Sequence, residues 1–242
     1  MGHSTGSQDV LHYLYRSNPC TSAPAFDLSL EHVTRSAVDG AILQAPVSDR
    51  ECIHWVLKTG FLGRTSEELR EVYDNLVSTA EASLRETSKN GQSGRTFDQT
   101  LPIALTSQLG YPADTPLSAR RFLSLVSPDS PASPSEDDLF SSDLSTSHLE
   151  TTFGMISQRG LLRKSLLVLP SGADQAVPDW IDKAALLERW RTAANGGGKD
   201  IWNAELSGPV PGASHALSND DQAEPRSVLN ERVLGFLKKL DD

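Results

Sequence analysis

The chain has 242 residues, with 32 acidic and 22 basic side chains and a formal net charge of -10. Its basic residues are scattered, which argues against a nucleic-acid partner, because phosphate binding requires Lys and Arg gathered on one surface. Apolar residues make up 38% of the sequence, a composition typical of a folded domain and not of a disordered chain. No window approaches about 18 consecutive apolar residues, so we expect no membrane-spanning segment and no membrane partner.

The two cysteines, Cys20 and Cys52, are too few for a disulfide framework and lack the spacing of a metal site. We therefore expect free thiols. The sequence does not open with a basic stretch followed by an apolar run, so a secretory signal is not predicted and a cytoplasmic location is favoured. If the natural protein begins upstream of Met1, a targeting segment could precede this sequence.

The first nine residues contain the most informative motif. Gly2, Ser4 and Gly6 form the pattern G-x-S-x-G, typical of a nucleophile elbow, in which a serine lies on a tight turn between a strand and a helix. Glycines suit such a turn because its backbone is strained and neighbouring elements approach closely. Short matches also arise by chance, and the alternative for Ser4 is an ordinary serine in a Gly-rich turn.

The next elements continue a βαβ pattern. Apolar spacing predicts a helix over residues 4–16, and the apolar run 37–46 predicts a strand covered on both faces. A comparable strand follows only at 165–170, more than a hundred residues later. Because connections in such folds are short, an inserted helical cap is expected between the two strands.

The insertion contains one strong helical pattern, over residues 65–87, and Thr65–Glu68 resembles a capping box at its start. Weaker helical patterns cover 50–58, 117–126 and 147–158, and a Gly-containing break is predicted at 90–94.

An acidic, Ser/Pro-rich segment at 127–147 is predicted to be a solvated loop, with a phosphorylated switch as the lesser alternative. The pair Arg120–Arg121 just before it could bind an acidic substrate group, but a surface position is the simpler interpretation.

After the second strand, a helix is predicted over 179–194, ended by a plain stop at Gly196–Gly198. A short strand at 202–210 and a closing helix at 224–240 follow. The closing helix places five apolar side chains on one stripe: Leu229, Val233, Phe236, Leu237 and Leu240.

These elements predict part of an α/β-hydrolase fold, consisting of the C-terminal half of a parallel sheet with flanking helices. Residues 1–49 and 161–242 would form the hydrolase core. Residues 50–160, including the acidic loop 127–147, would form a mainly helical cap.

A serine nucleophile needs an imidazole to take its proton and a carboxylate to orient that imidazole, and in α/β-hydrolases the order is Ser, acid, His. Asp174 lies just past the strand 165–170, at the carboxyl edge where such sheets build their sites. His215 lies on a Gly-containing loop after the last predicted strand. We therefore predict Ser4, Asp174 and His215 as a catalytic triad.

Other residues could compete for these roles. Asp49 follows the strand 37–46 and is the alternative acid, although helix capping or an ion pair with Arg50 explains it more simply. His3 lies inside the elbow and is too constrained to be the base. The remaining histidines are interpreted as packing or surface residues: His12, His32, His54 and His148.

Five segments carry a resemblance to a known family: 1–9, 41–50, 111–122, 171–183 and 211–218. Together they resemble a fungal family of α/β-hydrolases that includes intracellular esterases of the siderophore fusarinine C. The resemblance implies the same triad, a small-molecule ester substrate and hydrolysis of a hydroxamate siderophore after uptake, which would help to release iron. It implies no cofactor and no catalytic metal, since iron would arrive only with the substrate.

The resemblance also implies a difference at the start, because family members have several strands before the elbow. The chain would be truncated at its N-terminus relative to the family. The Thr5 N–H would supply one oxyanion donor, but the second normally comes from an earlier loop. We therefore expect this polypeptide alone to be poorly active and prone to aggregate. The alternatives are a non-catalytic or vestigial binding protein, or a lipase, thioesterase or peptidase.

Overall fold

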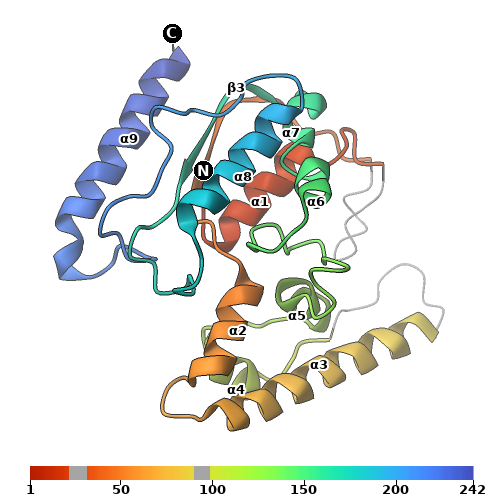
Figure 1. Cartoon of the computed structure of the whole chain (residues 1–242). Helices are drawn as coiled ribbons and strands as arrows, with labels where there is room; N and C mark the ends of the chain where they lie inside the picture. The colour runs from red at the N-terminus through yellow and green to blue at the C-terminus, as the bar shows by residue number, and fades with distance from the viewer. Residues whose placement is uncertain (22–31, 90–98, 242) are drawn as a thin grey trace. The chain divides into compact units, whose positions relative to one another are not determined.

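The computed structural model describes residues 1–21, 32–89 and 99–241 (Figure 1). The break predicted at 90–94 lies outside these residues. The described residues form two compact units, one comprising 1–21, 32–47 and 139–241 and the other comprising 48–89 and 99–138. Each unit has its own apolar core.

A three-stranded parallel sheet forms the centre of the first unit. Its strands are β1 (Gly2–His3), β2 (Val38–Gln44) and β3 (Leu162–Leu169), paired in that order. Leu43 of β2 lies opposite Gly2 on one side and Val168 on the other. The carboxyl ends of all three strands therefore lie at one edge of the sheet, where the following loops begin.

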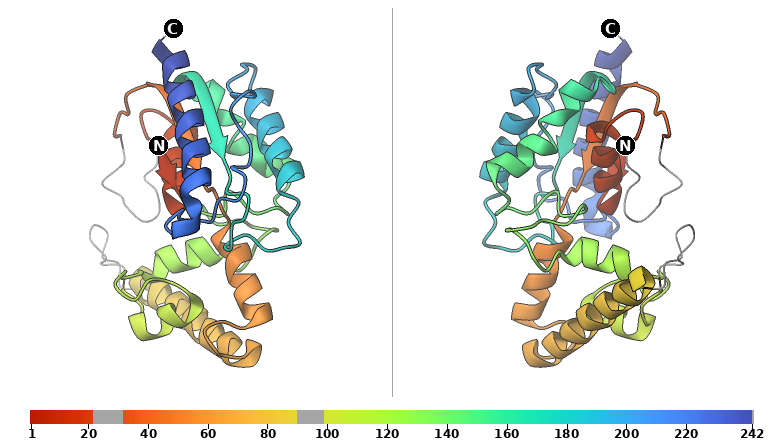
Figure 2. Two further views of the ribbon diagram at one scale, coloured as in Figure 1. Left: turned by 90° about the vertical axis from the view of Figure 1, so that its left-hand side faces the viewer. Right: turned by 90° about the vertical axis from the view of Figure 1, so that its right-hand side faces the viewer.

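Helices cover both faces of this sheet (Figure 2). On one face pack α1 (Thr5–Tyr15), α7 (Met155–Arg159) and α8 (Lys183–Gly196), and on the other packs α9 (Ala223–Asp241). Alternate strand side chains enter the two cores, since Leu166 and Val168 face the first layer whereas Leu167 and Leu169 face the second. The predicted buried strands and the helix after the elbow are confirmed.

Local polar contacts shift several predicted boundaries. The helix expected from residue 179 begins at Lys183, because the Asp182 carboxylate accepts the N–H groups of Ala184 and Ala185 as an N-cap. The helix expected over 147–158 is two helices, α6 (Thr146–Thr151) and α7. Gly154 lies between them, so close to Glu150 that a Cβ there would lie 2.5 Å from its carbonyl oxygen.

Two predictions for the C-terminal part are wrong. Residues 202–210 contain no regular strand and form only isolated bridges, from Trp202 to Leu166 of β3 and from Val210 to Ser171. The turn between these bridges interrupts the pairing. Leu237, expected on the buried stripe of α9, is 46% exposed, whereas Phe236 is buried in the second layer.

The second unit is helical, with α2 (Asp49–Thr59), α3 (Ser66–Lys89), α4 (Ile103–Thr106) and α5 (Ala119–Val126). The capping box before α3 is confirmed, because Thr65 N–H donates to the Glu68 carboxylate at 2.9 Å and Glu68 N–H donates to Thr65 Oγ1 at 3.3 Å. The core is built around buried side chains of all these helices except α4, including Ile53, Leu69, Leu76 and Phe122.

The acidic segment is not the solvated loop that its composition predicts. Asp137 and Asp138 are each only 2% exposed. Arg121 pairs with Asp137 at 2.6 Å, and Arg50 Nε donates to Asp138 Oδ2 at 2.9 Å. Arg121, the second residue of the Arg120–Arg121 pair, thus forms an internal ion pair. Composition could not reveal this arrangement, because it does not show which arginines the fold brings to these carboxylates.

The residues after this segment belong to the first unit. Leu139, Phe140 and Leu144 are buried there with Phe153 and Ile156. The second unit is therefore shorter than the predicted insertion 50–160, because the apolar side chains after Asp138 complete the core around the sheet. In the part of the chain that the structure describes, no helix is both long and apolar enough to cross a membrane.

The buried pair Arg50–Asp138 should contribute strongly to the stability of the second unit. We expect Arg50→Met to lower the free energy of unfolding by about 3–5 kcal/mol, because Asp138 would remain buried without its guanidinium partner. Urea unfolding followed by the fluorescence of Trp55, which lies on α2, measures this loss.

The matched control is Arg85→Met, in an exposed pair with Glu81 whose side chains are 65% and 44% accessible. Its expected change is below about 1 kcal/mol. Equal effects of the two substitutions would contradict the role of the buried pair.

Candidate active site

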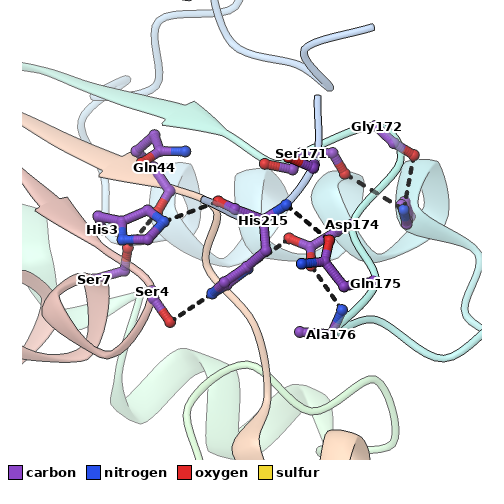
Figure 3. Close-up of polar contacts among 12 residues, drawn as sticks. His3, Ser4, Ser7, Gln44, Ser171, Gly172, Asp174, Gln175, Ala176 and His215 are labelled. Atoms are coloured by element: carbon purple, nitrogen blue, oxygen red, sulfur yellow. Dashed lines mark hydrogen bonds and ion pairs between the residues drawn. The ribbon is translucent and has the colours of Figure 1, made fainter. Parts of the chain in front are cut away.

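Ser4 lies on the sharp turn between β1 and α1. Its backbone has φ 54° and ψ -123°, a conformation that non-glycine residues rarely adopt. The turn is held by the neighbouring strand, because Ser4 N–H donates to the Gln44 carbonyl at 3.0 Å. Ser7 adds two contacts, since its hydroxyl lies 3.1 Å from the Gly2 carbonyl and 3.2 Å from that of Gln44 (Figure 3). These contacts hold the strained backbone of Ser4 in place from the strand before it and the helix after it.

The two glycines of the motif have different structural roles. A Cβ on Gly2 would lie 2.0 Å from the carbonyl oxygen of Gly6, a distance that no side chain can tolerate. Apart from its chain neighbours and the backbone of its own helix, a Cβ on Gly6 would meet no atom within 4 Å among the described residues. The close approach therefore requires glycine at position 2 and not at position 6.

Asp174 lies in the loop after β3. Its side chain is 1% exposed, and one carboxylate oxygen accepts Ala176 N–H at 2.9 Å. The loop is connected to its neighbour by Ala173 N–H, which donates to the Ala213 carbonyl at 2.9 Å. Lys183 Nζ donates to the Gly172 carbonyl at the same distance. Asp174 is thereby held with its second oxygen toward His215.

His215 connects the carboxylate to the serine (Figure 3). Its Nδ1 lies 2.9 Å from Asp174 Oδ2, and its Nε2 lies 2.8 Å from Ser4 Oγ. Because a carboxylate can only accept, the proton belongs on Nδ1, which leaves Nε2 to accept the serine hydroxyl. The structure thus brings the three predicted residues together in the order that proton transfer requires.

Three supporting residues were missed by the sequence interpretation. Gln175 Oε1 accepts His215 N–H at 3.0 Å, and Gln222 Oε1 accepts Ser214 N–H at 2.7 Å. His3 Nε2 lies 2.9 Å from the His215 carbonyl oxygen. None belongs to a recognisable motif of its own, although His3 is one of the two variable residues inside the elbow.

The competing candidates lie elsewhere. Asp49 is the first residue of α2 in the second unit, and His54 lies on the same helix. His12 lies on α1, where its Nδ1 accepts from Arg16 Nε at 3.0 Å. The described residues include no group of three or more His, Cys, Asp or Glu side chains that could hold a metal ion.

Thr5 occupies the position expected of an oxyanion donor. It is the first residue of α1, and the N–H groups of a first helical turn have no acceptor within the helix. The positive end of the helix dipole favours negative charge at the same place. The Thr5 N–H is therefore available beside Ser4.

A parallel sheet that leads into a serine-bearing turn, with acid and histidine loops at its carboxyl edge, defines a partial α/β-hydrolase fold. A solved structure, the siderophore hydrolase EstB from Aspergillus fumigatus, matches with a TM-score of 0.79 and 55% sequence identity. A family described as "Protein of unknown function (DUF1749)" matches residues 1–238, and the chain belongs to this family.

Named relatives extend the comparison. The chain is 61% identical to fusarinine C esterase sidJ of Aspergillus fumigatus over 99% of its length and 66% of that protein. It is 46% identical to an esterase of Emericella nidulans over 100% of its length and 65% of that protein. The match to EstB covers 99% of the chain and 65% of EstB. The resemblance inferred from the sequence is confirmed, and the chain spans about two thirds of these relatives.

The two elbow glycines provide a direct test of the turn. Gly2→Ala should lower the free energy of unfolding by at least about 2 kcal/mol, because its new methyl group would overlap the Gly6 carbonyl. Gly6→Ala should be tolerated, since the space is open and alanine favours helix. Thermal unfolding of both variants measures the difference. A Gly6→Ala variant as destabilised as Gly2→Ala would contradict this steric account.

Proposed function

We propose that the chain is a serine hydrolase that cleaves carboxylic esters. The observation that carries the proposal is the continuous hydrogen-bonded line from Ser4 Oγ through His215 to Asp174, with distances of 2.8 and 2.9 Å. In this proposal Ser4 is the nucleophile, His215 the general base and Asp174 the acid that orients it.

The reaction follows from the positions of these groups. Ser4 Oγ attacks the ester carbonyl while its proton moves to His215 Nε2, and the Asp174 carboxylate stabilises the resulting imidazolium. The tetrahedral oxyanion accepts a hydrogen bond from Thr5 N–H at the start of α1. Collapse releases the alcohol, which takes the proton from His215. A water molecule, activated by the same imidazole, then hydrolyses the acyl-serine and releases the acid.

The substrate class is proposed from the relatives. Proteins named fusarinine C esterase and siderophore hydrolase resemble the chain over nearly its whole length, including its second unit. We therefore propose ester bonds of a hydroxamate siderophore such as fusarinine C, hydrolysed in the cytoplasm to help release iron. The iron belongs to the substrate. The second unit is proposed to act as a cap that selects this substrate.

Substitution of the triad tests the reaction. Ser4→Ala should abolish covalent labelling by a fluorophosphonate and lower ester hydrolysis at least about 10³-fold. Asp174→Asn should lower kcat by about 10⁴-fold, since His215 would adopt the wrong tautomer. Hydrolysis of ferric and iron-free fusarinine C, followed by mass spectrometry, measures both losses. Activity retained by Ser4→Ala would reject the serine mechanism, and intact fusarinine C in every sample would reject the siderophore substrate.

The turnover of the 242-residue polypeptide is proposed to be low. Among the described residues we propose a single oxyanion donor, Thr5 N–H, and a site with one donor in place of two loses about 10²–10³-fold in rate. The measurement is the rate of fluorophosphonate labelling, compared with the longer Aspergillus fumigatus esterase of 61% identity. Equal rates would contradict the proposal, whereas stable ligand binding without any labelling would favour a non-catalytic binding protein.

A further inference from the structure

We propose that His3 is a positioning residue that fixes the general base His215 relative to the nucleophile Ser4; this inference rests on the proposed function. His3 Nε2 lies 2.9 Å from the carbonyl oxygen of His215 (Figure 3). A carbonyl can only accept, so His3 Nε2 carries the proton and donates it. The centroids of the two imidazole rings lie 5.1 Å apart at an interplanar angle of 45°.

The contact completes a closed set of interactions that connects His3, His215 and Ser4. His3 is bonded covalently to Ser4, His3 binds the His215 backbone, and the His215 ring binds Ser4 Oγ at 2.8 Å. The separation of base and nucleophile is therefore set by β1 as well as by the acid loop. A displaced His215 backbone would have to break the His3 contact before its ring could leave Ser4.

The loop that bears His215 depends on such individual contacts. Residues 211–219 contain no helix or strand, so their position is not set by regular pairing. Gln175 binds the N–H of His215 and Gln222 binds that of Ser214. Both contacts bind backbone N–H groups on the N-terminal side of His215. On its C-terminal side, the carbonyl of His215 is bound by His3, which lies on the strand that leads into the nucleophile.

A packing role does not account for His3. Its side chain is exposed, in contrast to the adjacent Gly2, which is buried. Replacement of an exposed side chain has little effect on core packing. Replacement of His3 should instead change the position of the His215 imidazole. A displacement of about 1 Å in a catalytic group can lower the rate about 10²-fold.

The test compares three substitutions in the full chain. His3→Phe keeps an aromatic ring but removes the donor, whereas His3→Gln places an amide N–H near the position of the original Nε2. His3→Asn carries a donor on a side chain too short to reach, and it replaces His3→Phe if that variant fails to fold. His54→Phe, at an exposed histidine of α2, is the matched control. Thermal unfolding confirms that each variant is folded.

The first readout is hydrolysis of p-nitrophenyl acetate. We expect His3→Phe and His3→Asn to lower kcat about 10- to 100-fold with little change in KM. His3→Gln should recover most of the rate, and His54→Phe should match wild type. Equal kcat for wild type and His3→Phe, or no recovery by His3→Gln, would overturn the proposal. Loss of activity in the unsubstituted protein would instead reject the proposed function.

The second readout needs no activity. The Nδ1 proton of His215, bonded to Asp174, should give a far-downfield resonance in the proton NMR spectrum, assigned by its loss in Asp174→Asn. His3→Phe should broaden or remove this resonance through exchange with water, and His3→Gln should retain it. An unchanged resonance in His3→Phe would overturn the proposal even if its kcat were lower, because His3 would then act elsewhere than on His215.

Discussion

The close passage of β1 over the first turn of α1 is the constraint on which the site depends. Ser4 is forced to φ 54°, and the passage is possible only because Gly2 has no side chain to meet the Gly6 carbonyl. Such a backbone costs about 1–3 kcal/mol and persists only where surrounding contacts support it. Here the support comes from Gln44, whose carbonyl receives both the Ser4 amide and the Ser7 hydroxyl. Ser4, the proposed nucleophile, is thereby fixed to the neighbouring strand independently of Asp174 and His215.

The partners of Ser4 come from loops, and polar contacts replace regular structure there. Asp174 and His215 lie in segments connected through Ala173 and Ala213, and glutamine side chains bind the peptide groups next to the imidazole. Each contact is modest, at about 0.5–1.5 kcal/mol, but together they limit the positions that the ring can adopt. The side chain of His215 is 18% exposed, whereas that of Asp174 is almost completely buried, so these polar contacts and not burial restrain the proposed general base.

The sequence predicts the periodic part of this fold well and its polar contacts poorly. The C-terminal parts of β2 and β3, residues 41–43 and 166–169, are buried on both faces and read as apolar runs, and α3 combines a capping box with a regular apolar stripe. By contrast, Asp137 and Asp138 look solvated in the sequence but are buried in ion pairs with Arg121 and Arg50. The predicted triad residues meet because their loops follow strands of one sheet. Gln175, Gln222 and His3 could not be predicted, since their roles depend on which backbone groups the folded loops present.

The proposed reaction class and the proposed substrate rest on different observations. The Ser4, His215 and Asp174 arrangement lies within the first unit, and nothing in it selects one acyl group over another. Selection requires surfaces outside the triad. The 61% identity to a fusarinine C esterase extends over 99% of the chain, so it includes the helical second unit as well as the elbow and the two loops. Likeness confined to the triad would support only the proposed ester hydrolysis, whereas likeness across both units also supports the proposed class of substrate.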